Sequence, residues 1–134
     1  MKSILAIVAG SVFIVVASLF MQLAYVLLAV EYNALAKSFA ILNEIRYLFR
    51  YLVGMPVFML IMFFGGVITA DIANSRVLLH CLVVGFVTVA GMMWLALGDR
   101  ELITLSGMVL SLLAIATTMA GGFYWERGDR SVAE

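Results

Sequence analysis

The chain has 134 residues, of which 66% are hydrophobic and only 12% are charged. A water-soluble domain of this length could not bury so large an apolar fraction in one core, so that class is excluded. Eight basic and eight acidic residues give a formal net charge of zero. No basic stripe could neutralise phosphates, so nucleic acid is not an expected partner. The composition indicates an integral membrane protein.

Four apolar stretches, none interrupted by a charged residue, fill most of the chain. They cover Ile4 to Val30, Leu52 to Ala70, Val77 to Leu97 and Leu102 to Trp125. Each is near or above the ~20 residues that a helix needs to cross ~30 Å of hydrocarbon. The first is much longer than the ~7 to 15 apolar residues of a secretory signal, so we expect it to be retained. The sequence therefore predicts an all-α membrane protein with four transmembrane helices in one domain, residues 1–134.

The connections between the stretches predict how the helices are arranged. Those at Asp71 to Arg76 and Gly98 to Glu101 are short, which favours antiparallel neighbours in up-down order. The connection from Glu31 to Tyr51 places apolar residues among charges at helical spacing. This pattern favours either an amphipathic helix in the membrane interface or helical extensions of the adjoining spans. Arg46 and Arg50 lie on one flank of that helix and are possible polar or ligand contacts.

Small residues recur at heptad spacing in the first and fourth spans. In lipid, small side chains let helices approach closely and gain van der Waals contact, so such stripes are typical of helix-packing faces. Either face could contact another helix of this chain or another subunit, and the heptad period favours shallow crossing angles. The stripes comprise Gly10, Ala17 and Ala24 in the first span, and Thr104, Gly107, Ser111, Ala114, Thr118 and Gly121 in the fourth.

Two glycine pairs stand near the predicted ends of the second and fourth spans. Gly65-Gly66 precedes Asp71, and Gly121-Gly122 precedes Glu126. We expect close packing and fraying of the helix ends at both pairs. The alternative is a place where the helices thin to admit a ligand.

Polar groups within the spans are few, and no charged residue lies near a span centre. Coupled ion transport by this chain alone is therefore not expected. Gln22 is the most polar side chain well inside a span, and it either bonds to another helix or lines a polar path with Ser11 and Ser18. His80 is expected to bond to a backbone carbonyl, with haem or quinone contact as the alternative. The single cysteine, Cys81, allows neither a disulfide nor a thiolate metal site within this chain.

No catalytic constellation is present, so we expect no enzymatic activity and no cofactor or metal. The sequence favours a non-catalytic membrane subunit that stabilises or assembles a larger complex through these small-residue faces, in contact with the lipid bilayer and with other integral membrane subunits or copies of itself. The alternatives are a homo-oligomeric pore or uncoupled carrier, and a haem- or quinone-associated anchor subunit. Four Lys or Arg residues fall on each side of the membrane, so charge sets no orientation. A plasma membrane is the default expectation, and compactness together with the absence of organelle signals favours a bacterial inner membrane.

Overall fold

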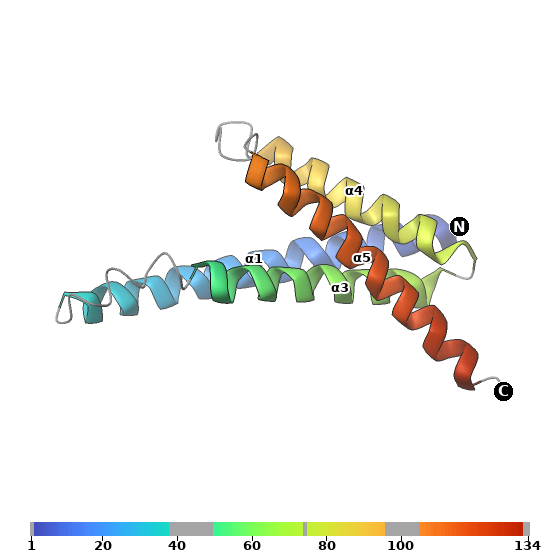
Figure 1. Cartoon of the computed structure of the whole chain (residues 1–134), viewed down its shortest axis with the longest axis horizontal. Coiled ribbons are helices and arrows are strands. Elements are labelled where there is room, and N and C mark those ends of the chain that lie inside the picture. Colours follow the sequence, from blue (N-terminus) through green and yellow to red (C-terminus); the bar gives the residue numbers. More distant parts are fainter. Residues whose placement is uncertain (1, 38–49, 74, 96–104, 133–134) are drawn as a thin grey trace.

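The computed structural model describes residues 2–37, 50–73, 75–95 and 105–132. The helices of this part are α1 (Lys2–Ala36), α3 (Met55–Ile72), α4 (Val77–Leu95) and α5 (Leu105–Val132), with a π-helical turn, η1 (Arg50–Gly54), leading into α3 (Figure 1). All four α-helices contain a segment long and apolar enough to cross a membrane. The predicted all-α transmembrane fold is confirmed, and the chain is a multi-pass membrane protein.

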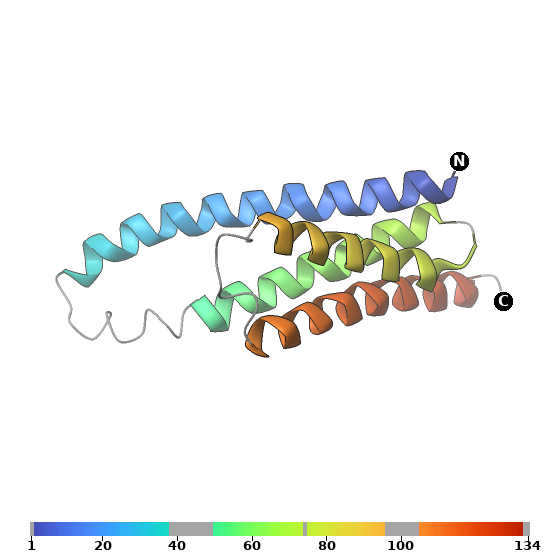
Figure 2. The ribbon, with the colours of Figure 1, turned by 90° about the horizontal axis from the view of Figure 1, so that it is seen from above.

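The helices run up and down, with α3 and α4 between α1 and α5. α3 contacts α1, α4 and α5, and α4 also contacts α1 and α5. Figure 2 places the two chain ends and the connection between α3 and α4 at one end of the bundle. At the other end the α1–α3 pair and the α4–α5 pair diverge, so that the molecule resembles an open X in Figure 1. Beyond its crossing with α3, the C-terminal part of α5 also runs away from the other helices (Figure 1).

Helix ends differ from the predicted span ends because hydropathy marks the lipid boundary and not the end of the helix. α1 continues six residues beyond Val30 to Ala36, as expected if the connection extends the adjoining span; residues 38–49 lie outside the described part. α3 begins at Met55 with Pro56 in its first turn, where a missing amide costs little. α5 continues past Trp125 to Val132.

The expected fraying at the glycine pairs is wrong. α3 continues six residues beyond Gly66, and α5 continues ten residues beyond Gly122. All four glycines are buried. Glycine inside a helix costs about 1 kcal/mol relative to alanine, and the close contacts with neighbouring helices described below offset that cost.

A cluster of four buried apolar residues, one from each helix, lies in the core: Ile14, Met62, Val84 and Ala114. Outside it, many large apolar side chains point away from the bundle. Ile4, Phe20, Phe86 and Leu112 are each more than 60% exposed. In water such a surface would be highly unfavourable, whereas it fits contact with lipid.

Candidate functional site

The contact between α1 and α3 depends on small residues. Gly10 of α1 and Gly65 of α3 are buried, and a Cβ added to Gly10 would overlap Thr69 Oγ1. A Cβ added to Gly65 would overlap the side chain of Ile14. The Thr69 hydroxyl donates to the Gly65 carbonyl at 2.7 Å, so the hydroxyl has its hydrogen-bond partner within α3. The backbones of the two helices can therefore approach closely at Gly10 and Gly65 while the Thr69 hydroxyl between them keeps a hydrogen-bond partner.

The contact between α3 and α5 brings backbone against backbone. A Cβ added to Gly66 would overlap the carbonyl oxygen of Thr118, and one added to Gly121 would overlap the carbonyl oxygen of Phe63. The Thr118 hydroxyl donates to the Ala114 carbonyl at 2.9 Å. Figure 1 shows α5 crossing α3 obliquely and not lying alongside it, unlike the shallow crossing that the heptad period favours. An oblique crossing concentrates the contact at one place, which these two glycines occupy.

The contact between α4 and α5 is similar but involves side chains. A Cβ on Gly122 would overlap Cys81 Sγ, and one on Gly85 would lie 3.2 Å from the Cα of Ile115. Cys81 is fully buried, and its thiol donates to the Gly66 carbonyl of α3 at 3.4 Å. Cys81 therefore lies where α3, α4 and α5 meet.

This position makes Cys81 a reporter of bundle opening. We expect a water-soluble maleimide to label Cys81 about a hundredfold more slowly in mild detergent than in denaturing detergent, because the buried thiol reacts only when the helices separate. The control is Ser75→Cys in a Cys81→Ala background, since Ser75 is exposed between α3 and α4. Equal labelling of the two positions in mild detergent would contradict the packing of α4.

The predicted packing residues occupy different environments in the structure. Gly10, Gly107, Ala114, Thr118 and Gly121 are buried. Ala17 and Ser111 are half-buried, and the Ser111 hydroxyl bonds to the Gly107 carbonyl at 2.9 Å. Ala24 is exposed, and Thr104 lies outside the described residues. The close contacts of both stripes are with α3, on opposite sides of it.

The surface of α3 that both stripes contact was not predicted from the sequence. Successive residues in a helix point about 100° apart, so adjacent glycines present two close-packing faces. Gly65 faces α1 and Gly66 faces α5; in the same way Gly121 faces α3 and Gly122 faces α4. A glycine pair in the middle of a helix could thus have been interpreted as a point where one helix contacts two others.

The remaining polar residues singled out from the sequence are separated in the structure. His80 is buried, and its Nδ1 lies 2.9 Å from the Arg76 carbonyl, to which it donates. The same carbonyl accepts the backbone amides of Leu79 and His80, so the histidine reinforces the first turn of α4. Gln22 is exposed, and its amide makes no hydrogen bond within the described residues. Arg46 and the side chain of Arg50 lie outside them.

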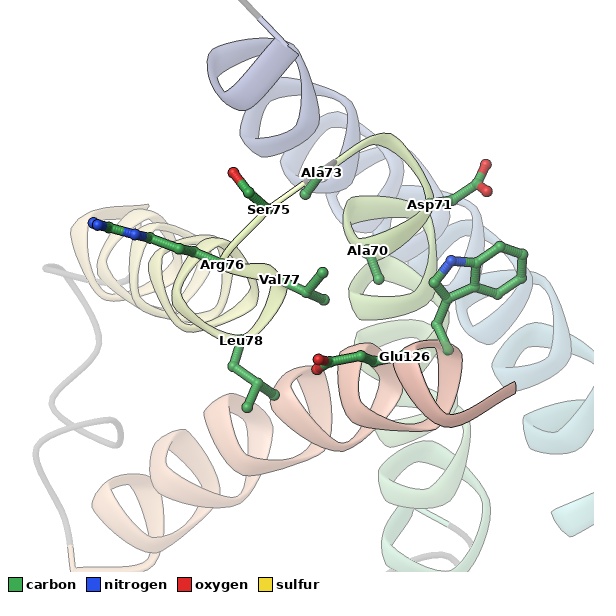
Figure 3. Close-up of a pocket in the computed structure, with 9 residues that line it drawn as sticks. Ala70, Asp71, Ala73, Ser75, Arg76, Val77, Leu78 and Glu126 are labelled. Carbon is green, nitrogen blue, oxygen red and sulfur yellow. The ribbon is translucent and has the colours of Figure 1, made fainter. Parts of the chain in front are cut away.

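A pocket of about 550 Å³ lies between the α3–α4 connection and α5 (Figure 3). Its polar lining comprises Asp71, Ser75, Arg76, Trp125 and Glu126, and the apolar residues Ala70, Ala73, Val77 and Leu78 complete it. In Figure 3 Asp71 and Arg76 point to opposite sides, while Glu126 is directed toward Val77 and Leu78. Within the described chain no three His, Cys, Asp or Glu residues are grouped as metal ligands. The pocket thus combines separated charges of both signs with an indole.

Comparison with known proteins yields no relative. No family model matches the chain, and no curated protein or solved structure is significantly similar to it.

Proposed function

We propose that the chain is a non-catalytic membrane subunit that assembles with other integral membrane proteins through the second half of α1. Within the described residues, this half of α1 has almost no buried position. From Gln22 to Leu35 every residue is exposed except Ala29 and Tyr32, which are half-buried. We place the protein in a plasma membrane, and by its compactness in a bacterial inner membrane.

The observation that carries the proposal is the overhang of α1. Its 35 residues make a helix of ~52 Å at 1.5 Å per residue, against the ~30 Å of a hydrocarbon core. Figure 2 shows α1 running well beyond the near ends of α4 and α5. From Leu23 to Val30 the overhang is apolar, and Val26, Leu28 and Val30 are each more than half exposed. A partner helix packed along it would cover surface that extends beyond the rest of the bundle.

Gln22 identifies the point of contact on this surface. It lies about 18 Å along α1 from Gly10, inside the candidate span Lys2–Leu35. A primary amide in hydrocarbon without a hydrogen-bond partner is unfavourable by several kcal/mol. Because Gln22 is exposed in the isolated chain, a polar side chain on a neighbouring helix would satisfy it and would fix the register of the two helices.

A homo-oligomeric pore or uncoupled carrier is the second candidate. The hydroxyls of Ser11 and Ser18 on α1 and of Thr88 on α4 are buried without a hydrogen-bond partner in the described residues. Unpaired hydroxyls of this kind could line a polar path if the helices separated. His80 already has a structural role at the start of α4, so no observation favours the haem or quinone anchor.

The test is purification of the tagged chain in a mild detergent followed by native mass spectrometry. We expect stoichiometric recovery of different integral membrane proteins, and a three- to tenfold loss of that recovery in Gln22→Leu, as for one hydrogen bond between transmembrane helices. Gln22→Asn keeps the amide and is the matched control, and unchanged Cys81 protection shows that the bundle still folds. Recovery of an oligomer of this chain alone would reject the subunit proposal in favour of the pore.

A further inference from the structure

A second pocket, of about 180 Å³, lies on the overhang of α1. The described residues that line it all belong to this helix: Tyr25, Leu28, Ala29, Glu31, Tyr32, Asn33 and Leu35. Four of them, Tyr25, Leu28, Ala29 and Tyr32, stand at positions i, i+3, i+4 and i+7, so they are neighbours on one face of the helix. In coiled-coil packing, four residues on a helix surface form the hole into which one side chain of the facing helix inserts. The pocket has the arrangement of such a hole.

The residues around this hole differ in size and exposure. Tyr25 and Leu28 are 41% and 56% exposed, whereas Ala29 and Tyr32 are half-buried. Tyr32 already interacts within the chain, so an occupant of the hole would recognise its shape and not a free Tyr32 hydroxyl. Alanine carries only a methyl group, which leaves the space between its larger neighbours open. The hole therefore suits one bulky apolar side chain.

The hole belongs to a line of residues that begins inside the bundle. The line comprises Ser11, Ser18, Gln22, Tyr25, Ala29 and Tyr32, which follow one another at steps of three, four or seven residues. The hydroxyls of Ser11 and Ser18 are buried, so helices of this chain cover the first part of the line. In Figure 2 the cyan end of α1 runs beyond the described ends of α3, α4 and α5. The same contact line thus continues onto a surface that these helices leave open.

The depth of the hole favours a transmembrane occupant. The uncharged run of α1 continues to Val30, and Glu31 borders the hole, so the hole lies where the apolar part of the helix ends. Gln22 is seven residues from Ala29, about 10 Å farther into the membrane. A water-soluble partner would not reach an amide at that depth, whereas a transmembrane helix passes both levels.

We propose that this hole receives one bulky aliphatic side chain from a transmembrane helix of the partner protein. A hydrogen-bonding side chain seven residues away on the same partner helix would lie opposite Gln22, because helices that pack at about +20° keep a period of 3.5 residues along their contact. The inference rests on the proposed function and adds the chemistry of the partner. A lipid acyl chain could fill the hole but would leave the Gln22 amide without a hydrogen bond.

The test is Ala29→Leu in the full tagged chain, purified in a mild detergent and analysed by native mass spectrometry. Leucine would fill the hole, so we expect recovery of the partner to fall about tenfold, as for overpacking of a fitted contact. The matched control is Ala24→Leu. Ala24 is exposed on the same helix, about 140° around it from Ala29, so recovery should not change. Ala29→Ser adds only one atom and should also retain the partner.

Three outcomes would overturn the inference. Equal recovery of the partner with Ala29→Leu and Ala24→Leu would show that no side chain enters the hole, and recovery of the partner by the unmodified chain would then still support the subunit proposal. If the unmodified chain recovered only copies of itself, both proposals would be rejected. Faster labelling of Cys81 in Ala29→Leu than in Ala24→Leu would show that the hole packs within this chain.

Discussion

Replacing Gly66 or Gly121 by alanine is expected to weaken the α3–α5 contact more than any other single methyl addition in the bundle. At both positions the added Cβ would overlap a backbone carbonyl, that of Thr118 or of Phe63. A backbone atom cannot move aside by changing rotamer, so the helices must separate or rotate. We expect each variant to lower the free energy of unfolding by about 3 kcal/mol, at the upper end of the cost of overpacking.

The matched control for this effect is Gly91→Ala in α4. Gly91 is exposed and a Cβ there would meet nothing within 4 Å, so alanine should leave stability unchanged or raise it by up to about 1 kcal/mol through its better helix propensity. The measurement is denaturation with sodium dodecyl sulfate in mixed micelles, followed by far-ultraviolet circular dichroism and by Cys81 labelling. If all three variants unfolded alike, the backbone contact between α3 and α5 would be wrong.

The sequence was sufficient to predict the four membrane helices and their order. A long uncharged apolar run crosses lipid most readily as a helix, since a helix forms all the backbone hydrogen bonds within its own segment. Helix ends were less predictable. α5 continues through Glu126 and Arg127 because charged residues mark where lipid ends, while the helix itself needs only unbroken backbone hydrogen bonds.

The partner of each packing face could not be predicted from periodicity. A heptad of small residues identifies a face of one helix and gives no information about the helix that faces it. The stripes of α1 and α5 both contact α3. In the sequence of α3, only the pair Gly65-Gly66 indicates a packing surface. The exposure of Gln22 could not be predicted from the sequence either, because it depends on the divergence of α4 from α1 beyond the core (Figure 1).

The pocket depends on residues distant in sequence. Asp71 and Arg76 flank one connection, but Trp125 and Glu126 follow about fifty residues later. Up-down topology placed Asp71 and Glu126 on the same side of the membrane. It could not show that the end of α3 and the last turns of α5 enclose a common space, because that depends on the oblique crossing at Gly66 and Gly121.

The contact between Gly65 and Ile14 predicts a compensating pair of substitutions. A Cβ on Gly65 would overlap Cγ1 and Cδ1 of Ile14, which are side-chain atoms that truncation removes. We expect Gly65→Ala alone to destabilise the bundle by about 2 kcal/mol through overpacking. Ile14→Ala alone should cost about 2 to 3 kcal/mol through the cavity it leaves. In the double variant the new methyl enters that cavity, so the total should fall below the sum by at least about 1 kcal/mol.

The Gly65 and Ile14 variants form one double-mutant cycle, and the matched control is a second cycle, Gly66→Ala with Thr118→Ala. There the overlap is with the carbonyl and Cα of Thr118, which truncation of the side chain leaves in place, so the two effects should add. The same detergent denaturation measures both cycles. We expect compensation in the first cycle and additivity in the second. This result would show that Gly65 leaves space for a side chain of α1, whereas Gly66 leaves space for the backbone of α5. Additivity in both cycles would mean that Ile14 does not pack on Gly65, and compensation in both would mean that α5 can shift along α3.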